Sequence, residues 1–279
     1  MDKYLVLGNP IDHSLSPSIH RMFAQQTKIE ITYDKKLVAI NQFDREIDSL
    51  VEKGFRGFNV TVPFKEDAFA KVNLANDCAS AAQAVNTIKV TGDSDLYGFN
   101  TDGVGLIRDL VDRMGLTLSS SRILVIGAGG AAKGVVAALL GHGPDSIVIA
   151  NRTMEKAKKL VTQFKEINQD AVIKCLELDK LDDGFDLIIN STSIGLAGEF
   201  NLVDDHVVKK KFCYDLAYGA SARFASWARN VGALKVADGL GMLVEQAAES
   251  FFIWRGLRPE TQQVLDTIRN HLINSKSES

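Results

Sequence analysis

Short apolar runs alternate with amphipathic segments along most of the chain, a pattern that is typical of an α/β protein. The runs are rich in valine, isoleucine and leucine, as expected for strands buried on both faces of a sheet. They predict strands at residues 4–8, 31–39, 55–62, 86–90, 96–99, 123–126, 147–150, 172–176, 185–190, 212–216 and 234–237. The intervening segments predict helices that begin after Ser16 and near Pro63, and helices at 42–53, 74–84, 103–115, 133–140, 239–255 and 260–273.

Local signals mark the ends of some helices. Ser16 precedes Pro17, so we expect Ser16 to be an N-cap and Pro17 to be the first helical residue. Phe43, Ile47 and Leu50 lie at amphipathic spacing in a helix that should end at Gly54.

The elements divide into two α/β domains. Strands and helices alternate over the first hundred residues without a glycine-rich loop, which indicates a separate task for this part. The last two helices have no strand between them, so we expect them to complete the first domain. The prediction is a domain of residues 1–102 completed by 240–279, and a doubly wound parallel domain at 103–239.

Composition excludes several classes of protein. With 279 residues, 46% of them hydrophobic, the chain can bury a large core. The net charge of −3 is spread along the chain, so we expect no nucleic-acid partner. No apolar stretch is long enough for a signal peptide or a membrane span, and the cysteines Cys78, Cys175 and Cys213 are far apart. We therefore expect a cytoplasmic protein with reduced, buried cysteines and, because its histidines lack ligand spacing, no metal.

A glycine-rich turn lies between a predicted strand and a predicted helix in the second domain. Its sequence is Gly127-Ala128-Gly129-Gly130-Ala131-Ala132. Gly127 permits the tight turn, Gly129 allows close approach of a pyrophosphate, and Ala132 allows the helix to pack close to the strand. A packed turn without a ligand is the alternative. Because strand, turn, helix and second strand occur in order, a dinucleotide site on the helix N-terminus is favoured.

The end of the following strand indicates which dinucleotide. An NAD site usually has an acidic residue there, but this chain has Asn151-Arg152-Thr153, with Lys156 one turn later. Arginine and lysine attract a 2′-phosphate that an acidic residue would repel. These residues could also form a solvated start of a helix, but their position favours NADP over NAD.

Five polar clusters lie outside the nucleotide unit, where element ends should meet. They are Ser14-Leu-Ser16, Asn59-Val-Thr61 with Lys65, Asn86-Thr87, Asn100-Thr101-Asp102 and Gln246. Each alone has a simpler explanation as a cap, a turn or a surface side chain such as the Gln246 amide. Together they supply hydroxyls, amides, a cation and a carboxylate, which suits a small polyhydroxylated acid.

The order of these motifs resembles that of the shikimate dehydrogenase family. The matching motifs are Gly8-Asn9-Pro10, Ser14-x-Ser16-Pro17-x-x-His20, Asn59-Val-Thr-Val-Pro63-x-Lys65, Ala84-Val-Asn86-Thr87, Gly98-x-Asn100-Thr101-Asp102-Gly103 and Asp238-Gly239-x-Gly241-Met242-Leu243-x-x-Gln246. The resemblance implies a substrate domain beside a Rossmann-type NADP-binding domain, and reversible NADPH-dependent reduction of 3-dehydroshikimate to shikimate in aromatic amino-acid biosynthesis. The sequence departs from the family pattern after Tyr218, where Ala222-Arg223-Phe224 stands in place of a Thr-Pro-Phe turn.

The resemblance also implies roles for individual residues. The implied substrate-binding residues are Ser14, Ser16, Thr61, Lys65, Asn86, Asp102, Tyr218 and Gln246. The implied cofactor-binding residues are Asp77, Gly127, Ala128, Gly129, Gly130, Ala131, Asn151, Arg152, Thr153, Lys156, Leu216 and Gly239, with Asn190-Ser-Thr192-Ser193 as a polar turn near the nicotinamide. Ketone reduction needs a proton on oxygen, for which Lys65 is the candidate acid, and the base in the reverse direction. Asp102 is assigned mainly to orienting Lys65 and the substrate hydroxyl, and the sequence leaves open which of the two residues transfers the proton.

Other functions remain open from the sequence. One alternative is a quinate/shikimate dehydrogenase that uses NAD, but NAD has no 2′-phosphate for Arg152 to bind. Another is a non-catalytic shikimate sensor, which would not need Lys65 and Asp102. Another two-domain NADP enzyme, such as a methylenetetrahydrofolate dehydrogenase, would want an aromatic-lined cleft for its pterin. We expect a monomer or a homodimer without membrane partners.

Overall fold

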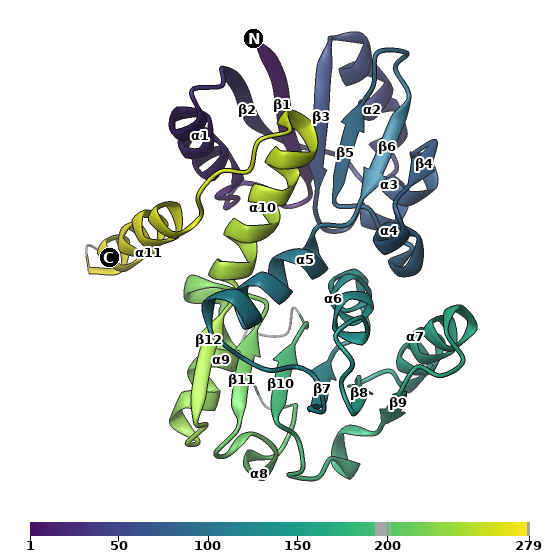
Figure 1. Cartoon of the computed structure of the whole chain (residues 1–279), viewed down its shortest axis with the longest axis vertical. Helices are drawn as coiled ribbons and strands as arrows, with labels where there is room; N and C mark the ends of the chain where they lie inside the picture. The colour runs from purple at the N-terminus through teal and green to yellow at the C-terminus, as the bar shows by residue number, and fades with distance from the viewer. Residues whose placement is uncertain (193–199, 201, 278–279) are drawn as a thin grey trace. The chain divides into compact units, whose positions relative to one another are not determined.

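The computed structural model describes residues 1–192, 200 and 202–277. The chain divides into two compact units, Met1–Gly105 with Leu243–Ser279, and Leu106–Met242. Each unit contains a six-stranded sheet (Figure 1). The predicted α/β class with two domains is confirmed by these sheets.

The sheet of the first unit is mixed. Its strands are β1 (Asp2–Gly8), β2 (Ile31–Leu37), β3 (Phe55–Val60), β4 (Leu74–Ala75), β5 (Thr87–Val90) and β6 (Leu96–Phe99), in the order β2-β1-β3-β5-β6-β4. β1 runs parallel to β2 and β3, whereas β5 is antiparallel to β3 and β6. The helices are α1 (Ser16–Thr27), α2 (Phe43–Glu52), α3 (Lys65–Lys71), α4 (Asp77–Ala82), α10 (Leu240–Arg255) and α11 (Gln262–Ser277).

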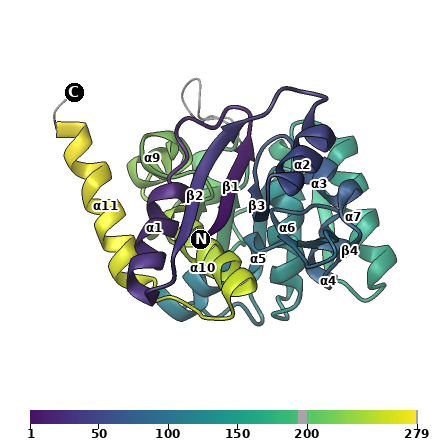
Figure 2. The same ribbon diagram turned by 90° about the horizontal axis from the view of Figure 1, so that it is seen from above.

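The central strand β1 is buried on both faces, because alternate side chains point to opposite sides of a strand. Leu5 and Leu7 belong to the core that contains the apolar faces of α2 and α3. Tyr4 and Val6 belong to a second cluster with Tyr33 of β2 and Trp254 of α10. Helix α1 lies beside β2 and contacts α11 (Figure 2).

Two local expectations are wrong in this unit. Helix α1 begins at Ser16 itself, with Leu15 as the N-cap, so the Ser16 side chain is not the capping group. The segment predicted as helix 74–84 contains the short strand β4, because residues 74–75 pair with β6. Asn76 then caps α4 by accepting a hydrogen bond from the Ala79 amide at 2.9 Å.

The sheet of the second unit is entirely parallel. Its strands are β7 (Arg122–Ile126), β8 (Ser146–Ala150), β9 (Ile173–Leu176), β10 (Leu187–Asn190), β11 (Phe212–Asp215) and β12 (Lys235–Asp238), in the order β12-β11-β10-β7-β8-β9. Its helices are α6 (Gly130–Leu140), α7 (Met154–Ile167), α8 (Asp205–Val208) and α9 (Arg223–Asn230). The strand order reverses at β7, which makes the sheet doubly wound as predicted.

Some details of this unit differ from expectation. The helix predicted at 103–115 consists of α5 (Asp102–Ile107) followed by a π-helix (Arg108–Arg113). Only a short 3₁₀-helix (Leu178–Lys180) separates β9 from β10, so helix and strand do not alternate there.

The expectation of buried cysteines is met at one position. Of the cysteines, Cys213 alone is buried, whereas Cys78 is exposed and Cys175 is half-buried. No helix in the described part of the chain has the length and apolar composition to cross a membrane.

His20 is enclosed in the aromatic cluster of the first unit. The side chain is 0% exposed, and its ring stacks on Tyr33 with centroids 4.1 Å apart and near Trp254 at 5.4 Å. Burial lowers the pKa of His20 from 6.5 to about 3. Between these pH values the unfolded chain binds a proton that the folded chain does not. The free energy of unfolding should therefore fall as the pH falls through this window.

We expect His20→Phe to make unfolding less sensitive to acid. One buried histidine contributes a slope of at most about 1.4 kcal/mol per pH unit, which phenylalanine removes while keeping an aromatic ring in place. Urea unfolding at a series of pH values between the two pKa limits measures the slope. His142→Gln is the control because His142 is exposed, and it should not change the slope. An unchanged slope in His20→Phe would show that the buried His20 is not the source of this acid sensitivity.

Candidate active site

Polar residues gather at one edge of the sheet in the first unit. The register pairs Leu7 of β1 with Val60 of β3, and Thr87 of β5 with both Asn59 and Phe99. The end of β1, the end of β3, the start of β5 and the end of β6 therefore lie together at this edge. The predicted substrate-binding segments follow or precede these strand ends.

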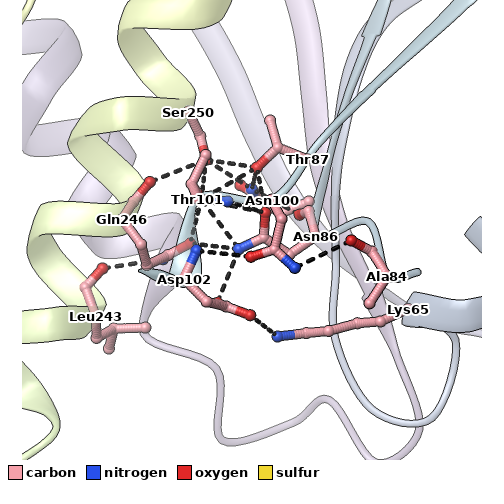
Figure 3. A network of polar contacts seen from close by, with 11 residues as sticks. Lys65, Ala84, Asn86, Thr87, Asn100, Thr101, Asp102, Leu243, Gln246 and Ser250 are labelled. Atoms are coloured by element: carbon pink, nitrogen blue, oxygen red, sulfur yellow. Dashed lines mark hydrogen bonds and ion pairs between the residues drawn. The ribbon is translucent and has the colours of Figure 1, made fainter. Parts of the chain in front are cut away.

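The Asp102 carboxylate joins two of the predicted residues. Its Oδ2 accepts a hydrogen bond from Lys65 Nζ at 2.5 Å, and its Oδ1 accepts one from Asn86 Nδ2 at 2.8 Å (Figure 3). The side chains of Lys65 and Asp102 are 15% and 8% exposed. An ammonium group has three donors, so Lys65 keeps donors for a ligand while Asp102 holds it in place.

Asn86 organises the neighbouring segments. Its Oδ1 accepts the backbone N–H of Thr101 at 2.9 Å, and its Nδ2 lies 3.4 Å from Gln246 Oε1. Gln246, on α10, also donates from Nε2 to the Leu243 carbonyl at 2.9 Å (Figure 3). Gln246 is therefore part of the polar network rather than a free surface amide.

A second set of side chains supports this network from behind, and sequence reasoning missed two of its members. Asn59 Nδ2 donates to Thr87 Oγ1 and to Ser250 Oγ, both at 3.0 Å. Tyr33 donates its hydroxyl to Asn59 Oδ1 at 2.6 Å. The missed residues are Tyr33 and Ser250. Ser250 lies one helical turn after Gln246, and that spacing was the one signal for its position.

The remaining predicted substrate residues are placed less directly. The Ser16 amide donates to Ser14 Oγ at 3.3 Å, and Thr61 packs at the end of β1, where a Cβ on Gly8 would lie 2.4 Å from Thr61 Cγ2. Among the described residues, no hydrogen bond joins Ser14, Ser16 or Thr61 to Lys65 or Asp102. Tyr218 belongs to the second unit, where burial raises the pKa of its phenol.

The glycine-rich turn of the second unit can accept a dinucleotide. Helix α6 begins at Gly130, so the first N–H groups of its backbone lack helical partners. A Cβ on Gly129 or Gly130 would meet nothing within 4 Å, whereas one on Gly127 would lie 2.4 Å from Ser191 Oγ. Gly127 has φ +115° and packs against the loop after β10. The turn therefore leaves open space at the helix N-terminus, where a pyrophosphate would bind.

The end of β8 fits a 2′-phosphate. Arg152, Thr153 and Lys156 are exposed, and Asn151 Nδ2 donates to the Thr153 carbonyl at 2.8 Å. Thr153 is the N-cap of α7, but its hydroxyl makes no capping bond. No carboxylate occurs at 151–153, so nothing in this turn would repel a phosphate monoester. Asp77, the other predicted cofactor residue, is exposed at the start of α4 in the first unit.

The two open glycines allow a direct test of the cofactor loop. Gly129 has an extended backbone (φ −92°, ψ −171°) that valine adopts readily, so Gly129→Val should keep the melting temperature of the wild type. Its side chain would occupy the space of the pyrophosphate and raise the KM for NADP⁺ by about 100-fold. Gly92→Val is the control, because Gly92 is equally open but lies in the first unit. An unchanged KM in Gly129→Val would exclude this loop as the phosphate site.

The loops after β10, β11 and β12 complete the same edge of the second sheet. Leu216 N donates to the Asn190 carbonyl and Gly239 N donates to the Ala217 carbonyl, both at 2.9 Å. Ser193, predicted in the polar turn after β10, lies outside the described residues. At the departure from the family pattern, Phe224 is fully buried in α9, beside Phe200.

Three family models and a known protein match this chain. Residues 6–88 match the shikimate dehydrogenase substrate binding domain, 109–211 match shikimate / quinate 5-dehydrogenase, and 239–269 match the shikimate 5′-dehydrogenase C-terminal domain. Shikimate dehydrogenase (NADP(+)) of Aeromonas salmonicida is 47% identical over 274 residues, which cover 98% of this chain and 99% of that protein.

Solved structures show the same similarity. Shikimate dehydrogenase from Aquifex aeolicus has a TM-score of 0.87 at 30% identity, covering 96% of this chain and 98% of that one. Shikimate 5-dehydrogenase from Thermus thermophilus, solved with NADP(H) and shikimate, has a TM-score of 0.83 at 31% identity, covering 97% and 99%. The chain belongs to the shikimate dehydrogenase family.

Proposed function

We propose that this chain is an NADP-dependent oxidoreductase that interconverts 3-dehydroshikimate and shikimate, a step toward chorismate and the aromatic amino acids. The observation that carries the proposal is the Lys65–Asp102 pair with Asn86, held at one sheet edge in a network of amides and hydroxyls. A cyclic acid with several hydroxyls needs such directed donors and acceptors. The names of the relatives support the same reaction for this chain.

We propose a division of labour between the two units. In the first, Ser14, Ser16, Thr61, Lys65, Asn86, Asp102 and Gln246 bind the substrate; we propose the same role for Tyr218, which belongs to the second unit. In the second, Gly127, Ala128, Gly129, Gly130, Ala131, Asn151, Arg152, Thr153, Lys156, Leu216 and Gly239 bind the cofactor, together with Asp77 of the first. This division follows residues 1–102 with 240–279 and residues 103–239.

The residues of the first unit account for the proton in the reaction. NADPH, when held by the glycine-rich turn of the second unit, would supply the hydride for the substrate carbonyl. Lys65 donates a proton to the developing alkoxide and, in the reverse direction, accepts it from the hydroxyl. Asp102 orients the Lys65 amine through the 2.5 Å contact, and Asn86 fixes Asp102. Both carboxylate oxygens of Asp102 are thus held, and the amine has one defined position.

The test is a comparison of four substrate pairs. Reduction of NADP⁺ or NAD⁺ with shikimate or quinate is followed by nicotinamide absorbance. We expect NADP⁺ with shikimate to give the highest kcat/KM. A preference for NAD⁺ or quinate would favour a quinate/shikimate dehydrogenase, and shikimate binding without turnover would favour a sensing role.

A further inference from the structure

Asp215, the last residue of β11, has a carboxylate that ties three segments of the second unit together. Its Oδ1 accepts hydrogen bonds from Asn190 Nδ2 at 2.9 Å and from the Ala217 amide at 3.2 Å. Its Oδ2 accepts the Ala225 amide, in the first turn of α9, at 3.1 Å. One side chain thus holds the end of β10, the loop after β11 and the start of a helix.

The buried carboxylate of Asp215 does not favour the stability of the fold. Asp215 is 0% exposed, and burial raises the pKa of its carboxyl group. Within the described ranges no lysine or arginine forms an ion pair with it, so one side-chain amide and two backbone N–H groups stabilise the charge. A buried charge without a cation is a poor way to stabilise a core, and an apolar side chain would serve better. The shape that the carboxylate gives to the loops it contacts therefore explains its presence better than a gain in stability does.

The loops that Asp215 holds are continuous with the cofactor turn. Asn190 Oδ1 accepts the amide of Thr192 at 3.2 Å and its hydroxyl at 2.7 Å, so it shapes the turn after β10. Ser191 Oγ donates to the Ile126 carbonyl at 2.8 Å, beside Gly127. On the other side, a Cβ on Gly239 would lie 2.2 Å from the Leu216 carbonyl oxygen. Contacts therefore run without a break from β7 to β12.

Topology assigns these loops to one end of a bound dinucleotide. A doubly wound sheet binds its ligand at the carboxyl ends of the strands, where the strand order reverses. That point is β7, with β8 on one side and β10, β11 and β12 on the other. Arg152 and Lys156 follow β8 and suit the 2′-phosphate of the adenosine half. The nicotinamide half would then lie over the loops that follow β10 and β11.

We propose that Asp215 is a positioning residue for the nicotinamide half of the cofactor site. It holds residues 190–192 and 216–218 in the shape that receives the nicotinamide, and Asn190 transmits part of this constraint. The assignment rests on the proposed function, since it presumes a nicotinamide cofactor. It concerns binding geometry and not a chemical step.

Two ligands separate positioning from general damage to the fold. NADP⁺ would contact both halves of the site, whereas adenosine 2′,5′-bisphosphate lacks the nicotinamide half. In Asp215→Asn one carboxylate oxygen becomes an NH₂ group, which faces at least one of the N–H donors that now bond to the carboxylate. We expect its Kd for NADP⁺ to rise about tenfold, while the Kd for adenosine 2′,5′-bisphosphate changes less than about twofold. Both values come from calorimetric titration of the folded full chain.

Two further variants keep the test decisive. Asn190→Ala removes one bond to Asp215 and both bonds to Thr192, and it should show the same selective loss if Asp215→Asn does not fold. Asp182→Asn is the matched control, because Asp182 pairs with Arg122 at the amino ends of the strands and should change neither Kd. Equal losses for both ligands, or no loss for NADP⁺, would overturn the proposal. Selective loss in a chain that does not oxidise shikimate would instead refute the proposed substrate alone.

Discussion

Replacing Lys65 by alanine should lower kcat by about 10²–10⁴-fold with little change in the KM for shikimate. The reason is that the Lys65 amine would act mainly in the transition state, when the oxygen gains or loses its proton. Lys65→Arg should be similarly slow, although a guanidinium can keep the ion pair with Asp102, because arginine does not release its proton at neutral pH. Steady-state kinetics in both directions measure these effects.

A second lysine of the same helix provides the control. Lys71 ends α3 and pairs with Asp48 at 2.7 Å, so Lys71→Ala removes an amine and an ion pair outside the network. It should keep kcat near that of the wild type. Near-normal turnover in Lys65→Ala, or full activity in Lys65→Arg, would remove Lys65 from the role of acid and base.

Replacing Arg152 by aspartate should lower the preference for NADP⁺ over NAD⁺ by about 100-fold or more. An aspartate after β8 would repel the 2′-phosphate and could accept hydrogen bonds from the ribose hydroxyls of NAD⁺. The KM for NADP⁺ should rise, and the KM for NAD⁺ should stay the same or fall. The ratio of kcat/KM for the two cofactors measures the change.

The same charge change farther along α7 is the control. Lys165 is exposed in the last turn of the helix, roughly 16 Å along its axis from Met154 at about 1.5 Å per residue. That separation exceeds the screening length of about 8 Å at physiological salt, so Lys165→Asp should not alter cofactor preference. If Arg152→Asp retains the full preference for NADP⁺, the cation does not bind the 2′-phosphate.

The sequence predicts best what depends on neighbouring residues. The turn from Gly127 to Ala132 is readable because strand, glycine turn and helix are consecutive, and the structure shows that unit with α6 beginning at Gly130. Strand β4 could not be read in this way, because its two residues become a strand only by pairing with β6. Ser16 carried a capping signal, but the helix begins one residue earlier than that signal implies.

Side-chain partners that are distant in sequence are the part that could not be predicted. The hydroxyl of Tyr33 meets Asn59, and Ser250 reaches Thr87 at 2.8 Å from a helix near the end of the chain. Asp215 and Asn190 meet because β10 and β11 are adjacent in the sheet. Strand order determines these contacts, and neither residue has a motif that reveals its partner. Lys65 and Asp102 were candidates by resemblance, but their contact at 2.5 Å required the fold.

The proposed function requires the cluster around Lys65 and Asp102 to receive the hydroxyl that is oxidised. A crystal structure of the chain with bound shikimate measures this most directly. We expect one ring hydroxyl within hydrogen-bonding distance of both Lys65 Nζ and an Asp102 carboxylate oxygen, with Asn86 contacting the same ligand. Shikimate bound away from these side chains, or with its carboxylate in place of that hydroxyl, would show that Lys65 and Asp102 do not have the proposed roles.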